Sequence, residues 1–256
     1  MTGAAPAAGK VLFHVSDLHF GLEDRAALDW FAREVAQHRP AAVLCTGDLT
    51  MRGRAREFAA AAEYLGALAV PVTVEPGNHD MPYYYNPVGR LLHPFRLYDR
   101  LEAALEGAFD LSGIEPEIGI VPLNTVAPAQ FRLNWSKGRV SNAGLDSALQ
   151  GLARHAGAAL RLVTCHHPLV EADTHGTAST RGGSRALAAL ARAGADAVLS
   201  GHVHDPFDKL VELDGQTIRI IGAGTLSQRL RATPPSYNRL EWSVEGGLVA
   251  RVQQLA

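Results

Sequence analysis

The chain has 256 residues, of which 47% are hydrophobic and 20% charged, and its formal net charge is −2 at pH 7. This composition is typical of one α/β domain, with or without a small subdomain, and the weak negative charge argues against nucleic acid or an anionic membrane as a partner. No apolar run approaches the roughly 18 residues that a membrane-spanning helix needs. Cys45 and Cys165 lie in apolar runs and are expected to be buried free thiols. We therefore expect a cytoplasmic protein, and whether it forms a homo-oligomer is left open.

The N-terminal residues 1–10 are rich in Ala, Gly and Pro. They lack the basic segment and apolar core of a signal peptide, so we interpret them as a short disordered leader. Residues 11–256 are then expected to form the folded domain.

Apolar periodicity divides the folded part into alternating strands and helices. The first half predicts strands at 11–15, 42–46 and 70–75, separated by helices at about 24–38 and 55–68. A β-α-β-α-β start favours parallel strands with right-handed crossovers. The second half predicts, in order, strand 118–124, a helix from the N-cap Asn142 to about 155, strand 159–165, helix 184–193, strand 196–200 and two hairpins with turns at Asp214-Gly215 and Glu245-Gly246-Gly247.

Residues 81–117 interrupt this alternation with an irregular segment and a helix around 95–106. Because the insertion directly follows a strand tip that carries polar side chains, we expect it to form a cap over the site. Packing of the insertion against the body of the domain is the alternative interpretation.

Five of the apolar runs end in side chains that can bind a metal. In an α/β sheet, ligands and catalytic groups gather at the carboxyl ends of the strands. The five tips therefore predict one shared site. They are Asp17-Leu18-His19, Gly47-Asp48, Gly77-Asn78-His79, His166-His167-Pro168 and Gly201-His202-Val203-His204.

Spacing within the tips supports a metal centre. Asp17 and His19 are two residues apart, as are His202 and His204, and an extended backbone would turn both members of each pair to one side. Oxygen and imidazole ligands without a thiolate suit Mn, Fe, Zn or Co. One ion seldom takes seven such ligands, whereas two divalent ions with a bridging carboxylate would, and two ions can bind a phosphoryl group. The full set is Asp17, His19, Asp48, Asn78, His166, His202 and His204.

The order of these motifs resembles the calcineurin-like metallophosphoesterase superfamily. Within it, the variants Ser16-Asp17-Leu18-His19, Gly47-Asp48-Leu49-Thr50, His166-His167-Pro168-Leu169 and Gly201-His202-Val203-His204 resemble the group of class III cyclic-nucleotide phosphodiesterases and glycerophosphodiesterases.

The resemblance implies an α/β fold, a four-layer α/β/β/α sandwich of two mixed sheets flanked by helices. It also implies a dinuclear centre with a metal-bound hydroxide as nucleophile. His79 would be the catalytic residue that binds phosphate or protonates the leaving oxygen. One metal would be bound by Asp17, His19, Asp48 and His204, and the other by Asp48, Asn78, His166 and His202.

Departures from related motifs leave some roles open. Met51 stands where protein Ser/Thr phosphatases carry a carboxylate that supports the catalytic histidine, so what orients His79 is undecided. Arg52 occupies the place of a phosphate-binding arginine in those enzymes, although a surface ion pair is the alternative. Asn124 and His167 are further candidates for contact with substrate.

The sequence therefore predicts a metal-dependent phosphoric ester hydrolase, most readily a phosphodiesterase acting on small diesters such as cyclic nucleotides. A nucleotide-type pyrophosphatase or a phosphomonoesterase on the same centre is one alternative. A non-catalytic scaffold that keeps the fold is another.

Overall fold

The computed structural model describes residues 9–83, 86–105, 111–114, 116–128, 136–177 and 180–256. Residues 1–8 of the expected leader lie outside this part of the chain, as do residues 84–85, 106–110 and 115 of the expected insertion. The disordered leader and the division into domain and cap therefore stay predictions.

Two five-stranded sheets form the centre of the molecule. In the first sheet, three parallel strands are extended by an antiparallel pair, in the order β10-β9-β1-β2-β3. In the second, four parallel strands are extended by one antiparallel strand, in the order β4-β5-β6-β8-β7. The first sheet comprises β1 (Lys10–Val15), β2 (Ala42–Cys45), β3 (Val72–Val74), β9 (Ser236–Ser243) and β10 (Gly247–Gln254), and the second β4 (Ile118–Pro122), β5 (Leu160–Thr164), β6 (Ala197–Ser200), β7 (Phe207–Leu213) and β8 (Gln216–Gly222).

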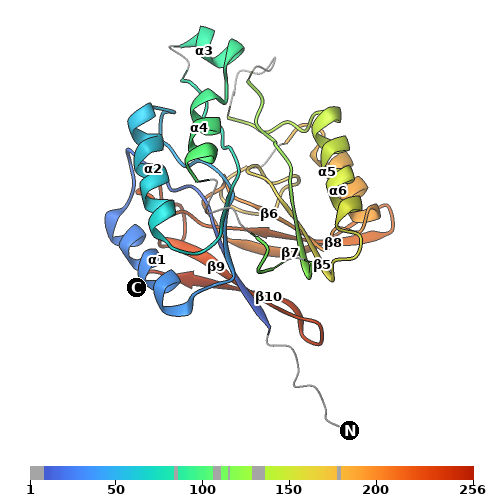
Figure 1. Cartoon of the computed structure of the whole chain (residues 1–256). Coiled ribbons are helices and arrows are strands. Elements are labelled where there is room, and N and C mark those ends of the chain that lie inside the picture. Colours follow the sequence, from blue (N-terminus) through green and yellow to red (C-terminus); the bar gives the residue numbers. More distant parts are fainter. Residues whose placement is uncertain (1–8, 84–85, 106–110, 115, 129–135, 178–179) are drawn as a thin grey trace.

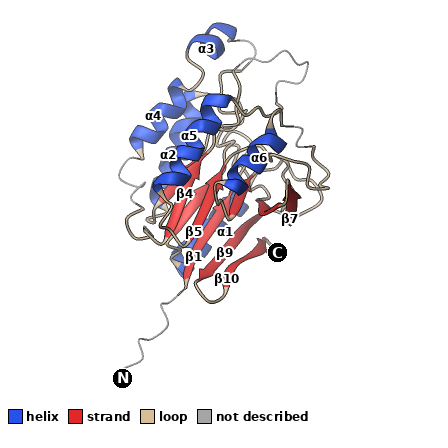
Figure 2. Ribbon diagram, turned by 90° about the vertical axis from the view of Figure 1, so that its right-hand side faces the viewer, coloured by secondary structure: helices blue, strands red, loops and turns tan. Residues whose placement is uncertain are grey.

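Helices cover the outer face of each sheet, so the molecule has four layers (Figures 1 and 2). Helices α1 (Arg25–His38), α2 (Ala55–Ala67) and α4 (Arg96–Ala104) cover the first sheet, and α5 (Asn142–Arg154) and α6 (Gly183–Arg192) cover the second. Alternation along the strands supplies each side of a sheet with its own apolar residues. The fold class implied by the resemblance is confirmed.

Three apolar cores separate the four layers. Phe13 of β1 packs with Phe31 of α1 on the outer side of the first sheet, whereas Leu12 faces the second sheet. Between the sheets, Leu12 and Leu44 pack with Leu162 and Leu199. Both cysteines are buried free thiols, as expected.

Most expected elements are present within a few residues. The N-cap of α5 is Ser141 and not Asn142, because the extended backbone of Ser141 lets its hydroxyl accept a hydrogen bond from the amide of Gly144 at 3.0 Å. The Asp214-Gly215 turn has positive φ at both residues, at 51° and 73°, as a tight hairpin turn requires.

A short helix, α3 (Pro87–Leu92), was not expected within the insertion. Its start has recognisable signals, since Pro87 lies in the first turn and the Asn86 side chain accepts from the amide of Gly89. The following helix α4 packs onto the first sheet, and the hydroxyl of its Tyr98 donates to the carbonyl of Val74 at 2.8 Å. The described part of the insertion is thus anchored to the body, with α3 at its outer end (Figure 1).

Within the described residues, none of the helices combines the length and the apolar character needed to cross a membrane. The cytoplasmic location stays a prediction.

Glu75 links the two sheets at the edge that carries the polar tips. Its carboxyl group follows β3, is 5% exposed, and accepts a 2.6 Å hydrogen bond from the hydroxyl of Thr164 at the end of β5. Burial raises the pKa of Glu75 to about 8, and the hydrogen bond from Thr164 offsets only part of that effect. The side chain is therefore protonated in the folded protein at neutral pH.

This raised pKa makes the stability of the fold depend on pH. The unfolded chain ionises Glu75 near pH 4.5, so the free energy of unfolding falls as the pH rises from about 4.5 through about 8. Glu75→Gln should remove that loss, and its melting temperature should exceed that of the wild type by a margin that grows from pH 5 to pH 9. Glu63→Gln, at an exposed carboxylate of α2, serves as the control. A constant difference between the Glu75 variant and wild type across this range would contradict the assignment.

Candidate metal centre

The seven expected ligands come together where the carboxyl ends of both sheets meet. Asp17 Oδ1 lies 3.0 Å from His204 Nε2 and 3.5 Å from His19 Nε2. Asp48 Oδ2 lies 3.7 Å from His19 Nε2 and 3.4 Å from His166 Nε2. Asp48 therefore stands between two groups of side chains, as a bridging carboxylate would.

Asn78 and His202 complete the second group. The amide oxygen Oδ1 of Asn78 lies 3.2 Å from His166 Nε2, and the rings of His166 and His202 are 5.2 Å apart. The main-chain N–H of His202 also donates to Asp17 Oδ2 at 2.8 Å, which connects the two groups.

The backbone reaches this arrangement through left-handed turns. The expected pairs do converge, but the extended backbone assumed for them is wrong, because both members of each pair have positive φ. Such backbone is strained for residues other than glycine, by about 1–3 kcal/mol each, and gathers at functional sites. The φ values are 58° for Asp17, 46° for His19, 52° for Asp48, 70° for His202 and 60° for His204.

Glycines let the ligand loops approach one another. A Cβ on Gly77 would lie 2.2 Å from the main-chain nitrogen of Asp48 and 2.1 Å from its Oδ1. A Cβ on Gly201 would lie 1.8 Å from Ser16 Oγ and 2.7 Å from Asp17 Oδ2. Only glycine fits at these contacts, so two strand tips can close around the carboxylates.

The tautomer of three histidines follows from their hydrogen bonds. Nδ1 contacts a main-chain carbonyl oxygen in His19 (Thr50, 3.3 Å), His166 (Thr46, 2.8 Å) and His204 (Arg229, 2.6 Å). A carbonyl oxygen only accepts, so Nδ1 carries the proton. In the neutral ring, Nε2 then presents its lone pair to the centre, as in metal-binding histidines.

The Nε2 atoms and carboxylate oxygens of the cluster lie close to one another. His19 Nε2 lies 3.3 Å from His204 Nε2, and the buried Asp17 Oδ1 accepts no hydrogen bond from the described residues. Burial lowers the pKa of His19 to about 4 and of His202 to about 3, which favours the neutral form that binds metals. At His166, burial acts in the same direction, but the carboxylates of Asp48 and Asp17 prevail and raise its pKa to about 9. The cluster thus attracts positive charge, and its donors fit divalent metal ions.

His79 lies beside this cluster with its ring fixed from the main chain. Its Nδ1 donates to the carbonyl oxygen of Met51 at 2.8 Å, and its main-chain N–H donates to Asp48 Oδ1 at 2.8 Å. The methionine lacks a supporting carboxylate, but its backbone oxygen orients the ring. The opposite nitrogen, Nε2, lies 2.9 Å from Nη1 of Arg229.

Asp80 joins two of the ligand loops and was not singled out from the sequence as a positioning residue. Its carboxylate accepts four hydrogen bonds, from the amides of Leu49 (3.2 Å), Thr50 (2.8 Å) and Gly77 (2.8 Å) and from the Thr50 hydroxyl (2.9 Å). These bonds fix Asp48 and Asn78 relative to each other. The position of Asp80 directly after Gly77-Asn78-His79 was the available signal.

A pocket of about 270 Å³ opens over the cluster. Its walls are cross-linked loops, because Lys137 donates to the carbonyl of Thr177 at 2.7 Å and Asp205 accepts from the amides of His175 and Ala232, each at 3.1 Å. No sequence motif marks these walls. Besides the expected site residues, the described lining consists of Ser136, Lys137, His175, Gly176, Thr177, Val203, Arg229 and Arg231.

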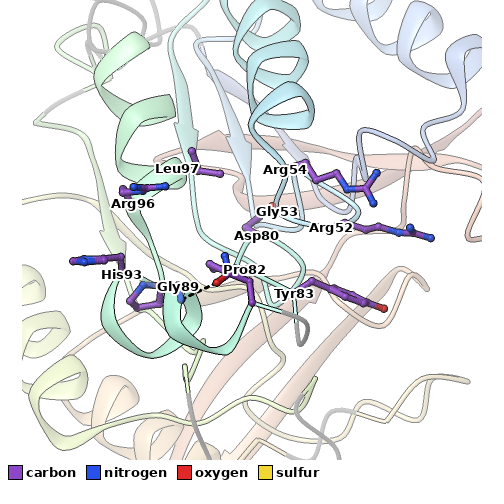
Figure 3. Close-up of a pocket in the computed structure, with 12 residues that line it drawn as sticks. Arg52, Gly53, Arg54, Asp80, Pro82, Tyr83, Gly89, His93, Arg96 and Leu97 are labelled. Carbon is purple, nitrogen blue, oxygen red and sulfur yellow. Dashed lines mark hydrogen bonds between the residues drawn. The ribbon is translucent and has the colours of Figure 1, made fainter.

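The three expected substrate residues do not line this pocket. Arg52 borders a separate pocket of about 410 Å³ with Asp80 and Tyr83 (Figure 3). Asn124 borders another, and its Oδ1 accepts from the amide of Val126 at 2.8 Å. His167 is buried, with Nδ1 2.9 Å from Thr125 Oγ1 and Nε2 2.9 Å from the carbonyl of Ser136.

The described part of the 81–117 insertion also borders the Arg52 pocket, through residues such as Pro82, His93 and Leu97, and contributes nothing to the described lining over the cluster. Its role as a cap and the substrate contacts of Arg52, Asn124 and His167 stay predictions.

Residues 11–206 match the family model for calcineurin-like phosphoesterases. This match covers most of the chain, so the chain belongs to the calcineurin-like phosphoesterase family. Within the described residues, several groups of His and Asp side chains could hold a metal ion.

Individual relatives match this chain over a short stretch or at low sequence identity. The glycerophosphodiester phosphodiesterase GpdQ of Enterobacter lignolyticus is 36% identical over 81 aligned residues. The match covers 27% of this chain and 29% of that protein. A dimetal phosphatase from Danio rerio has a similar fold, with a TM-score of 0.62 and 14% identity over 94% of this chain and 98% of that one. The purple acid phosphatase PPD1 from yellow lupin gives a TM-score of 0.61 and 13% identity over 98% of this chain and 52% of that one.

The close approach at Gly77 can be tested directly. Gly77→Ala would force the main chain of Asp48 to move. The variant should lose about 3 kcal/mol of unfolding free energy and should bind less metal per protein molecule. Thermal unfolding and elemental analysis would measure both effects. Gly157→Ala is the matched control, because its Cβ would meet nothing within 4 Å. Equal behaviour of the two variants would contradict the packing described here.

Removal of metal should destabilise the protein. Metal ions at a free concentration about 100 times their dissociation constant add about 2.7 kcal/mol to the free energy of unfolding. This corresponds to roughly 5–10 °C in melting temperature for a chain of this size. We expect EDTA to lower the melting temperature by that amount and added Mn²⁺ to restore it. The isosteric variant Asp17→Asn should show a smaller EDTA effect. An unchanged melting temperature in EDTA would argue against a metal centre.

Proposed function

We propose that the protein is a metal-dependent phosphodiesterase acting on small diesters, with cyclic nucleotides first among the candidates. One divalent ion would be held by Asp17, His19, Asp48 and His204, and a second by Asp48, Asn78, His166 and His202. The observation that carries the proposal is the set of imidazole nitrogens and carboxylate oxygens that lie 3.3–3.7 Å from one another beneath a small pocket. Mn, Fe, Zn or Co would suit these ligands.

Two such ions, when bound, would offset the charge of the phosphoryl group and activate a water molecule at neutral pH. The chain's own residues hold and orient this centre. Asp48 is placed to serve both ions, and the amide oxygen of Asn78 adds a ligand without adding negative charge. The centre thereby keeps enough positive charge to attract a phosphate anion.

In this proposal, His79 would act on the substrate through Nε2. Its Nδ1 donates to the carbonyl of Met51. The other ring nitrogen, Nε2, lies beside Arg229, and both residues line the pocket. For this role the ring would take up a second proton on Nε2 in place of the hydrogen bond from Arg229, and that proton could be donated to a phosphate oxygen or passed to the leaving alkoxide. A small leaving group would fit the volume of about 270 Å³.

The preference for a diester is supported by the motif variants and by the partial similarity to a glycerophosphodiester phosphodiesterase. A phosphomonoesterase or pyrophosphatase is the second candidate. It is favoured by the cationic side chains of Lys137, Arg229 and Arg231 in the pocket lining, which could balance an additional negative charge.

A hydrolysis screen distinguishes these functions. The metal-depleted protein would be reloaded with Mn²⁺ and assayed on bis(p-nitrophenyl) phosphate, p-nitrophenyl phosphate, 2′,3′-cyclic AMP and 3′,5′-cyclic AMP. We expect diester turnover to exceed monoester turnover at least tenfold, and the cyclic pair to narrow the substrate.

Asn78→Ala and His79→Ala should each lower turnover by about 100-fold or more while the melting curve keeps its cooperative form. A preference for the monoester would favour the second candidate. Full activity of the His79 variant would contradict the role proposed for His79.

A further inference from the structure

Arg229 reaches the centre of the site from a loop that no motif marked. Its Nη1 lies 2.9 Å from His79 Nε2 and 3.3 Å from His19 Nε2. The residue is half-buried and borders the pocket together with Asp48 and Asn78. Its guanidinium therefore lies within hydrogen-bonding distance of both His79 and a candidate metal ligand.

The backbone around Arg229 is fixed to the ligand loops. Its carbonyl accepts from His204 Nδ1 at 2.6 Å, and its amide donates to Ser227 Oγ at 3.3 Å. Thr225 Oγ1 lies 2.7 Å from Ser227 Oγ and donates to the carbonyl of Asp17 at 2.7 Å. The position of the side chain is therefore set by the same contacts that set the candidate metal ligands.

The hydrogen-bonding capacity of the guanidinium suits an anion. The group offers five N–H donors in one plane and stays charged at any physiological pH. Nη1 contacts the imidazoles, whereas Nε and Nη2 make no hydrogen bond to the described residues. When His19 Nε2 binds an ion, its lone pair is no longer available to Arg229. The guanidinium then remains beside His79 with donors for phosphate oxygens.

We propose that Arg229 is a catalytic residue that binds the non-bridging phosphate oxygens of the substrate, side by side with His79. It takes the role that the sequence suggested for Arg52, which borders a different pocket. This inference rests on the proposed function, because it assumes that the pocket receives a phosphoester.

The test compares Arg229→Gln, Arg229→Lys and Arg52→Gln in the metal-loaded full chain. With bis(p-nitrophenyl) phosphate, Arg229→Gln should lower kcat/KM by about 100-fold, the usual loss when one donor to a developing charge is removed. Arg229→Lys should recover part of the loss, since it keeps the charge but not the planar pair of donors. Arg52→Gln should stay within about threefold of the wild type.

A second readout does not depend on turnover. Isothermal titration with inorganic phosphate should show binding to Arg229→Gln that is at least about tenfold weaker than to wild type. Metal content and melting temperature should be unchanged.

Three results would overturn the inference. They are unaltered phosphate binding and turnover in Arg229→Gln, a loss that falls on Arg52→Gln instead, and a loss of metal in Arg229→Gln that parallels its loss of activity. Inactivity of the wild type on every ester would contradict the proposed function alone, since the phosphate titration still tests Arg229.

Discussion

The structure is organised around one electrostatic constraint: imidazole nitrogens and carboxylate oxygens are buried close to one another. His19 Nε2 and His204 Nε2 lie 3.3 Å apart, and Asp17 Oδ1 is buried beside both. In a medium of low dielectric constant such an arrangement is costly unless a cation offsets it. The strained left-handed backbone of five ligands adds to that cost. The fold thus sustains at this edge a geometry that only bound positive charge makes favourable.

Each of the two ligand groups takes residues from both sheets. Asp17 and His19 follow β1 of the first sheet, whereas His204 follows β6 of the second; Asp48 and Asn78 likewise meet His166 and His202. The hydrogen bond from the His202 amide to Asp17 Oδ2 and that from Thr164 to Glu75 join the sheets at the same edge. Binding of metal and packing of the two sheets are therefore coupled, and loss of either is expected to weaken the other.

Main-chain carbonyls orient several of the histidine rings in the site. The carbonyls of Thr46, Thr50 and Arg229 fix the tautomers of three histidines, and the carbonyl of Met51 orients His79. A backbone oxygen is present whatever the side chain, so a methionine can occupy a place where related phosphatases use a carboxylate. Loop conformation, held here by the four hydrogen bonds to Asp80, then decides the orientation of the His79 ring.

The sequence by itself determined the alternation of strands and helices in the first half and the seven candidate ligands, and the resemblance of its motifs implied the sandwich class. Periodicity and residue type are local properties, and they survive any rearrangement of loops, as the helix expected at about 24–38 and found as α1 illustrates. Only the tertiary structure decided that Arg52 borders a separate pocket and that Arg229 lies against His79, 150 residues away in the chain. It also decided that left-handed backbone, and not an extended one, brings Asp17 and His19 together. Contacts made by main-chain carbonyls and by residues from distant loops leave no pattern in the sequence, because they depend on how the chain closes in space.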